Sequence, residues 1–187
     1  MNWEDALSRL KSGNENFTTD QLEGKQQNAE RRDVLSGGQS PYAIILSCAD
    51  SRVVPELAFD TGLGELFVIR VAGNVANTST IASIEYAVAN LGTKLIVVMG
   101  HQSCGAVGAA VQGGDAGPNL NRLVSYITPS VEKLGSDANL TDIIRDNADN
   151  SAKTLVEKSQ IITSAIDENE VKVITAYYHL DSGRVDF

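Results

Sequence analysis

Hydrophobic positions follow two different periods along this chain. Strand-length apolar runs, together with one short edge segment near the C-terminus, occupy residues 42–47, 65–72, 94–100, 171–180 and 183–187. Helical patterns or polar helix-forming stretches occupy 3–12, 27–38, 79–92, 104–114, 119–134 and 139–169. Apolar strands that alternate with helices are typical of a parallel sheet covered on both faces. We predict an α/β fold with a mostly parallel central β-sheet of four to five strands flanked by helices.

The N-terminal segment has the pattern of an amphipathic helix. Trp3, Leu7 and Leu10 fall at helical spacing, and Gly13 is a residue that can end such a helix. The apolar stripe is equally consistent with packing on its own sheet and with an arm that reaches a second chain. We expect residues 1–36 to form an N-terminal helical arm.

Glycines and small polar residues mark the ends of two more predicted helices. Gly37 and Gly38 stop the polar helix 27–38, and Gly92 stops the helix 79–92, for which Thr78 or Ser79 is the expected cap. No repeat, low-complexity tract or linker interrupts the chain. We therefore expect residues 1–187 to form a single domain.

Charge and hydropathy exclude several classes of partner. Fifteen basic and twenty-four acidic residues give a formal charge of −9, which disfavours nucleic acid and anionic membrane surfaces. No run approaches the roughly 20 apolar residues of a membrane-spanning helix. The N-terminus lacks the basic and apolar regions of a signal peptide, so a cytoplasmic location is expected, although an exported mature chain would look the same.

Polar, chemically reactive residues follow two of the predicted strands. Cys48, Asp50 and Arg52 come directly after the strand 42–47, and His101 and Cys104 follow the strand 94–100. In parallel sheets, ligands bind beyond the carboxyl ends of the strands. If these two strands are neighbours, two thiols and an imidazole converge, which suits Zn²⁺ with one coordination position left open for catalysis.

Two other interpretations of the cysteines remain at this point. Cys48 and Cys104 are the only cysteines of the chain, and they could be small buried core residues or a disulfide or redox pair. An aspartate and an arginine directly after a buried strand are costly unless they serve each other or a ligand. That cost favours a functional site.

The two motifs together resemble those of a known family. CADSR at 48–52 and HQSC at 101–104 resemble the paired C-x-D-x-R and H-x-x-C motifs of β-class carbonic anhydrases of the bacterial type. Further segments match the family in order: ALSRLKSGNENF, GQSPYAIILSCADSRVVPELAFDTGLGELFVIRVAGN, SIEYAVANLG, VVMGHQSCGAV and AYYHLDSGRV. The resemblance covers nearly the whole chain, and the paired motifs are specific.

The resemblance implies a carbonate dehydratase, a zinc lyase that reversibly hydrates carbon dioxide to bicarbonate and a proton. Cys48, His101 and Cys104 are then the ligands of one Zn²⁺ per chain. The Asp50–Arg52 dyad orients a zinc-bound hydroxide that attacks the substrate, and in the family's inactive arrangement the aspartate becomes a fourth zinc ligand. The alternative for Asp50 is a surface helix cap or salt bridge.

The resemblance also implies a set of residues that bind substrate. Gln39 matches a glutamine that donates a hydrogen bond to substrate, and the backbone N–H of Gly105 points at a substrate oxygen. Phe67, Ala72 and Tyr86 match positions that line the apolar carbon dioxide pocket. Each has a simpler alternative: Gln39 as a loop residue and the apolar three as core packing.

Assembly and regulation are further implications. The family forms homodimers and homotetramers, with the pocket usually completed across the dimer interface. A tryptophan of some bacterial members, linked to an inhibitory bicarbonate site, is replaced here by Ile45, although the associated arginine is present as Arg70. We therefore expect an open, type I-like site without bicarbonate gating. His179 either carries protons at the site mouth or is a surface or packing residue.

Three rival functions remain open from the sequence. Carbonyl sulfide or carbon disulfide hydrolysis could use the same ligands, because these substrates are isoelectronic with carbon dioxide. A zinc-storage or structural protein is a second rival, but it would not need the Asp50–Arg52 pair. A dithiol redox protein is the third, and it would not hold zinc tightly.

Overall fold

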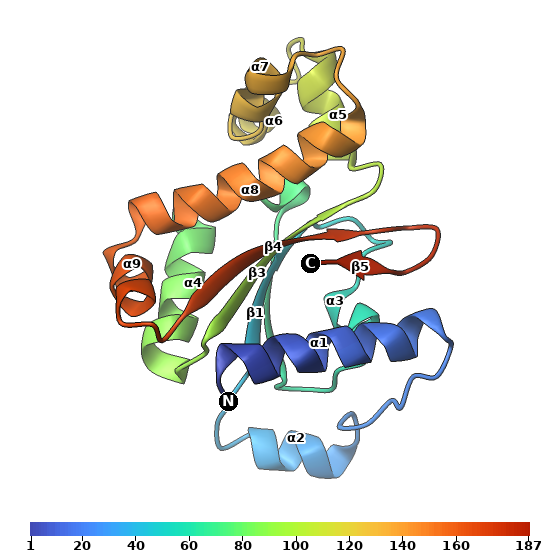
Figure 1. The fold of residues 1–187 in the computed structure, drawn as a ribbon, viewed down its shortest axis with the longest axis vertical. Coiled ribbons are helices and arrows are strands. Elements are labelled where there is room, and N and C mark those ends of the chain that lie inside the picture. Colours follow the sequence, from blue (N-terminus) through green and yellow to red (C-terminus); the bar gives the residue numbers. More distant parts are fainter.

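The computed structural model, which describes residues 1–187, contains one five-stranded sheet (Figure 1). Its strands are β1 (Ala43–Ser47), β2 (Leu66–Arg70), β3 (Leu95–His101), β4 (Lys172–Tyr178) and β5 (Val185–Asp186). The order is β2-β1-β3-β4-β5, parallel except for β5, which runs antiparallel to β4. The predicted fold class is confirmed, and β1 and β3 are direct neighbours.

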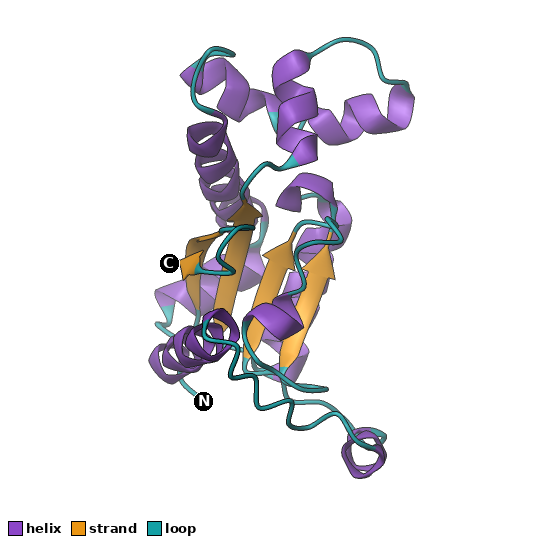
Figure 2. Ribbon diagram, turned by 90° about the vertical axis from the view of Figure 1, so that its right-hand side faces the viewer, coloured by secondary structure: helices purple, strands orange, loops and turns teal.

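Helices cover both faces of this sheet and extend beyond one end of it (Figure 1). Their bounds are α1 Trp3–Thr18, α2 Ala29–Leu35, α3 Pro55–Ala58, α4 Thr78–Leu91, α5 Gly105–Gln112, α6 Pro118–Val124, α7 Thr128–Leu134, α8 Leu140–Lys158 and α9 Gln160–Asp167, with a 3₁₀ turn η1 at Ala72–Asn74. On one face lie α4, α8 and α9, and α1 covers the other. Figure 2 shows α2 apart from the sheet, and none of its residues is buried. No helix combines the length and hydrophobicity that a membrane span requires.

The two central strands are buried on both faces. Ile45 and Val97 pack toward α1, whereas Ile44 and Val98 pack toward α4 and α8, and all four are fully buried. Successive strand residues point to opposite faces, so a strand covered on both sides must be apolar at every position. This explains why the sequence shows continuous apolar runs instead of an alternating pattern.

Helix α1 is longer than its sequence pattern predicted. It continues through Gly13 to Thr18, and Gly13 is buried where the helix crosses the chain near Phe59. A Cβ atom at Gly13 would lie 1.9 Å from the Phe59 carbonyl oxygen. The glycine therefore permits close contact between backbones instead of ending the helix, and the prediction for Gly13 is wrong. Leu10 is fully buried on the protein's own sheet.

We expect Gly13→Ala to lower the free energy of unfolding by at least about 1–3 kcal/mol, because the added methyl group must displace backbone atoms. Gly108→Ala is the matched control within α5, where an added Cβ meets no atom within 4 Å. That change should stabilise by about 0.5–1 kcal/mol, as usual for glycine in a helix. Urea unfolding of both variants measures the difference, and equal free energies would contradict the close contact.

Two other helix boundaries differ from the predicted ones. The N-cap of α4 is Asn77, whose side chain accepts from the backbone N–H groups of Ser79 and Thr80, so the expected cap at 78 or 79 is wrong. Asparagine is as good a cap as serine or threonine, so the local pattern did not separate them. Each of the two long polar segments, 119–134 and 139–169, contains a break between two helices. The second break has Ser159 as the cap of α9.

Candidate metal centre and active site

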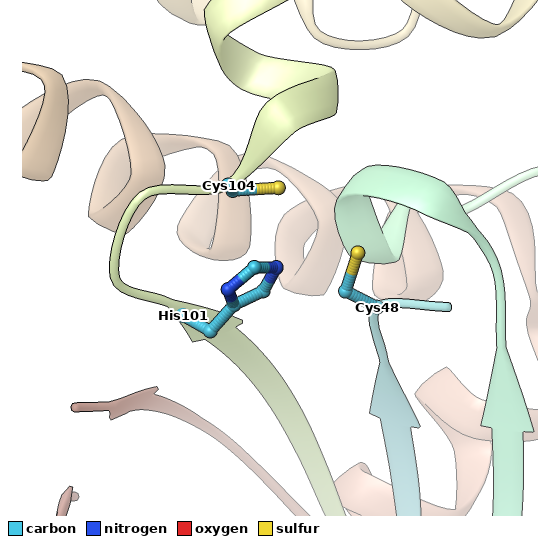
Figure 3. Close-up of side chains that lie close together, drawn as sticks. All are labelled: Cys48, His101 and Cys104. Carbon is cyan, nitrogen blue, oxygen red and sulfur yellow. The ribbon is translucent and has the colours of Figure 1, made fainter. Parts of the chain in front are cut away.

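Three potential metal ligands converge at the carboxyl end of the sheet (Figure 3). Cys48 follows β1 directly, His101 is the last residue of β3, and Cys104 is the N-cap of α5. All three side chains are buried, and their ligand atoms lie within 4.8 Å of one another. The convergence expected of two neighbouring parallel strands is confirmed.

The hydrogen bonds of His101 leave one ring nitrogen free for a metal ion. Nδ1 lies 2.9 Å from the Gln102 carbonyl oxygen, and because a carbonyl only accepts, Nδ1 carries the proton. Nε2 is fully buried and has no hydrogen-bond partner. Histidines that bind metals characteristically donate their other N–H to a carbonyl or carboxylate in this way. The residues present therefore fit a metal ion.

The surroundings of Cys48 favour the thiolate, which is the form that binds metals. A hydrogen bond from the Cys104 thiol is the largest influence that lowers the pKa of the Cys48 thiol below its usual value, and the N–H of Gly73 acts in the same direction. The Gly73 nitrogen lies 3.4 Å from the Cys48 sulfur. Two sulfur donors, one imidazole and an open position form a set that suits Zn²⁺.

Asp50 and Arg52 form a bidentate pair beside this cluster. Oδ1 of Asp50 accepts from the backbone N–H and from Nε of Arg52, both at 2.9 Å, and Oδ2 accepts from Nη2 at 2.7 Å. The hydrogen bonds from Arg52 hold the pKa of the Asp50 carboxyl far below its usual range, so it is ionised at neutral pH. Oδ2 lies 3.9 Å from Nε2 of His101. The carboxylate therefore faces the ligand cluster while the arginine holds it.

Arg70 fixes the backbone of the same loop. Its Nε donates to the Cys48 carbonyl at 3.0 Å, and its Nη2 donates to the Asp50 carbonyl at 2.6 Å. Arg70 is the last residue of β2, next to β1 in the sheet. Its guanidinium thus links the edge strand to the loop that carries both a candidate ligand and the candidate catalytic carboxylate.

Comparison with known proteins decides which family has this arrangement. The family model described as carbonic anhydrase matches residues 43–185. The chain belongs to the β-carbonic anhydrase family. It is thus a member of an enzyme family, the carbonate dehydratases, which are lyases.

Curated relatives and solved structures agree with this β-carbonic anhydrase assignment. Carbonic anhydrase 2 of Mycobacterium tuberculosis is 38% identical over 186 residues, covering 96% of this chain and 89% of the relative. The carbonic anhydrase of Mycolicibacterium smegmatis is 38% identical over 188 residues, covering 97% and 91%. Among solved structures, a tetrameric β-carbonic anhydrase of Sordaria macrospora is 28% identical with a TM-score of 0.77, covering 85% of this chain and 86% of its own.

Only some of the expected substrate residues of this β-carbonic anhydrase lie beside its own ligand cluster. Ala72 adjoins Gly73, and Gly105 adjoins Cys104 at the first turn of α5. Gln39 instead lies before β1, at the opposite end of this strand from the ligand cluster. The five residues of β1 span roughly 16 Å, so Gln39 is far from the cluster.

The two aromatic residues of the expected pocket lie toward the amino end of the sheet. Phe67 is level with Ile44 at the start of β1, and the rings of Phe67 and Tyr86 have centroids 6.4 Å apart. Tyr86 is half exposed on α4. The chain therefore does not bring Gln39, Phe67 and Tyr86 to its own candidate metal centre.

His179 belongs to a polar cluster at the β4–β5 edge. Its Nε2 lies 2.8 Å from Asp186, and its ring meets Tyr177 edge-on with centroids 4.9 Å apart. Asp186 also accepts from Arg145 at 2.9 Å and pairs with Arg184. These contacts match the packing interpretation of His179, which was one of the two alternatives drawn from the sequence.

The Asp186 cluster makes stability depend on pH. The hydrogen bond with His179 is the largest influence that lowers the pKa of Asp186 in the folded protein. The contribution of the Asp186 carboxylate to stability is therefore present above the pKa of an unfolded aspartate, about 3.9. It is lost as the pH falls through the lower pKa that Asp186 has in the folded protein. We expect the free energy of unfolding of the parent protein to exceed that of Asp186→Asn near pH 6, and the gap to shrink below about pH 4. Parallel curves in urea unfolding across pH 3–7 would contradict this.

Sequence reasoning missed two residues near the centre of this β-carbonic anhydrase. Gly73 donates to the Cys48 sulfur, and Asn147 of α8 donates to the Gly73 carbonyl. A glycine just after the second strand is a weak signal for a close approach. Nothing in the sequence separates Asn147 from the other polar residues of its helix.

Proposed function

We propose that this chain catalyses the zinc-dependent, reversible hydration of carbon dioxide to bicarbonate and a proton. The observation that carries the proposal is the buried, partnerless Nε2 of His101 with two cysteine sulfurs within 4.8 Å, beside a carboxylate held ionised by arginine. A purely structural zinc site needs no such carboxylate–guanidinium pair. Membership of the carbonic anhydrase family supports the same reaction.

The proposed cofactor is one Zn²⁺ per chain, held by Cys48, His101 and Cys104. Bound there, Zn²⁺ would supply a Lewis acid that lowers the pKa of water from 15.7 to about 7. Asp50 lies close enough to serve as a fourth ligand in a closed state, since its Oδ2 is 3.9 Å from the free nitrogen of His101. In this structure the carboxylate is instead engaged by Arg52, which corresponds to the open arrangement.

Asp50 and Arg52 have the chemical role of orienting the attacking oxygen. An ionised carboxylate is an acceptor only, so it takes a hydrogen bond from the attacking hydroxyl group and turns an oxygen lone pair toward the carbon of carbon dioxide. Arg52 fixes both carboxylate oxygens in a bidentate contact, which sets their direction. Positioning of this kind lowers the barrier without any change in the dyad itself.

The first turn of α5 supplies a site for the charge that develops on the substrate. Gly105 is the first residue of this helix, where partial positive charge collects and the N–H groups lack partners within the helix. Its N–H would donate to an oxygen of carbon dioxide or bicarbonate. Ala72 would form part of the apolar wall beside the ligands.

A homodimer would bring the remaining substrate residues into place. Gln39, Phe67 and Tyr86 would complete the pocket of a partner chain, because their own protomer holds them away from its centre. β2 is an edge strand with one side unpaired, and Tyr86 is an exposed aromatic residue beside it. The Sordaria macrospora relatives are described as tetrameric, which supports a homodimer or a homotetramer here.

We expect Tyr86→Glu to shift the molar mass measured by light scattering toward the monomer and to lower kcat/KM together with it. A charge in a desolvated interface is costly, and the pocket of the partner would lose an aromatic wall. Leu134→Glu, at an exposed apolar position on α7, is the matched control and should keep the mass and the turnover. A monomeric parent protein at micromolar concentration would contradict the shared pocket.

Arg70 supports the proposal of an enzyme without bicarbonate gating. Two of its guanidinium donors are engaged by the Cys48 and Asp50 carbonyls, and Ile45 replaces the tryptophan of gated relatives. A bicarbonate-bound crystal with the ion at Arg70 and Asp50 turned to the metal would overturn the absence of gating.

Free thiol ligands suit a reducing compartment, so we place the enzyme in the cytoplasm.

The proposed substrate is tested by comparing three linear molecules on one zinc-loaded preparation. We expect kcat/KM for carbon dioxide to exceed the values for carbonyl sulfide and carbon disulfide by orders of magnitude. Stopped-flow acid release measures the first reaction, and hydrogen sulfide release measures the other two. A preference for either sulfur substrate would replace carbon dioxide as the substrate while keeping the same ligands.

A further inference from the structure

We propose that Asn147 is a positioning residue for the metal centre and that it acts on Cys48 through the backbone of Gly73, whose carbonyl it binds and whose N–H points at the sulfur. The inference rests on the proposed zinc site, since it concerns how one of the ligands of that site is held. Asn147 touches neither the candidate ligands nor the substrate position directly. It lies in the middle of α8, which packs along the sheet and beside η1.

Two hydrogen bonds in series connect Asn147 to the sulfur. Its Nδ2 donates to the Gly73 carbonyl at 2.8 Å, and the N–H of Gly73 donates to Sγ of Cys48 at 3.4 Å. Both bonds are buried, and they join segments that are 74 and 25 residues apart in sequence. Asn147 itself is fully buried, so no water competes for its amide hydrogens.

The backbone of Gly73 is fixed from its other side as well. Its φ of 71° lies in the left-handed region that favours glycine. A Cβ atom there would meet Ile127 Cδ1 at 2.7 Å and the Cβ of Ala106 at 3.3 Å. The turn is therefore held between the side chains behind it and Asn147, and the direction of its N–H depends on both.

The stability of the fold alone does not explain an asparagine at position 147. Its Oδ1 is buried without any partner, and its helix neighbours Ile143 and Ile144 pack in the same apolar cluster as Cys48 and Cys104. A buried acceptor without a partner is destabilising, and a leucine of similar size would avoid that cost. A half-satisfied amide at this place is explained if its donor is needed to hold the backbone of Gly73, on both sides of its Cα, in the conformation that points the N–H at Cys48.

Loss of the Asn147 side chain should change how the sulfur of Cys48 binds the metal. An N–H that points at a thiolate orients it and withdraws part of its charge, and removing such outer partners typically costs 10–100-fold in metal affinity. We therefore expect Asn147→Leu to bind Zn²⁺ about 10–100-fold more weakly in competition with a chromophoric chelator. In the Co²⁺-substituted protein, the sulfur-to-metal absorption band should move to longer wavelength, because the sulfur becomes richer in electrons.

The matched control is Asn150→Leu, the same substitution three residues further along α8, where the side-chain amide forms no hydrogen bond. It should leave the zinc affinity and the cobalt band unchanged. If Asn147→Leu does not fold, as judged by circular dichroism, Asn147→Ala removes the same donor without adding a branched side chain and gives the same two readouts.

The outcomes separate this inference from the proposed function. A parent protein that binds neither Zn²⁺ nor Co²⁺ stoichiometrically overturns the metal site and the inference with it. A parent that binds both metals, with Asn147→Leu equal to Asn150→Leu in affinity and in the cobalt band, overturns the role of Asn147 alone. Loss of stability with both metal readouts unchanged assigns Asn147 a purely structural role and has the same effect.

Discussion

Replacing Asp50 by asparagine should lower kcat/KM for carbon dioxide hydration by about 10²-fold or more, the cost of losing the orientation of a reacting group. The amide keeps the shape of the side chain but loses the charge that Arg52 holds and places an N–H₂ group where a second acceptor oxygen stood. The attacking hydroxyl would lose the acceptor that orients it. Zinc content should remain one per chain, because the three ligands are untouched.

The control for this variant is Asp137→Asn, which removes the same charge at an exposed position in the loop before α8. Its kinetics should equal those of the parent protein. Stopped-flow hydration measured alongside zinc analysis separates a catalytic effect from loss of metal. Full activity in Asp50→Asn would mean that the dyad has only a structural role, whatever the metal does.

Replacing Cys104 by alanine should remove both the zinc and the activity. Three protein ligands are available while Arg52 holds Asp50, and the loss of one leaves a site that is two-coordinate from the protein. Without the metal, water keeps a pKa far above 7, so we expect hydration to fall by at least about 10³-fold. The loss of zinc binding should also be measurable without substrate, as a loss of the stabilisation that Zn²⁺ gives the folded protein. Free Zn²⁺ at 1,000 times its Kd would raise the free energy of unfolding of the parent by about 4 kcal/mol and should leave Cys104→Ala unchanged.

Ser47→Ala serves as the control, because Ser47 is a buried residue beside Cys48 whose hydroxyl has no hydrogen-bond partner. It should keep the zinc and the stabilisation by zinc. Chemical unfolding with and without Zn²⁺ gives both comparisons. If Cys104→Ala were stabilised by Zn²⁺ as strongly as the parent, Cys104 would not be a ligand.

The architecture and the ligand cluster were predictable from the sequence for one physical reason. Strands covered on both faces must be apolar throughout, so their ends are sharply marked by the first polar residues. Those residues are Cys48 after β1 and His101 at the end of β3. Parallel neighbours end at the same edge of a sheet, so the pattern predicted that these residues, about 50 positions apart, lie side by side if their strands are neighbours, and the pairing of β1 with β3 meets that condition.

Other features depend on contacts that a sequence pattern does not record. Gly13 looked like the end of a helix, because only the approach of the Phe59 backbone shows that a glycine is required inside α1. Asn147 is one polar residue among many on α8, and only its position opposite Gly73 distinguishes it. Phe67 and Tyr86 matched pocket positions in the family, and only the register of β2 against β1 shows that they lie toward the other end of the sheet from the ligand cluster.

Stopped-flow hydration of carbon dioxide by the zinc-loaded protein, at pH 7 and again at pH 8.5, tests most directly whether the centre beside Asp50 is catalytic. We expect one zinc per chain and fast hydration at both pH values, since Asp50 is ionised and held by Arg52 and not by the metal. Activity at pH 8.5 only would contradict the open site while leaving the enzyme in place. Stoichiometric zinc with no hydration at either pH would contradict the proposed function itself.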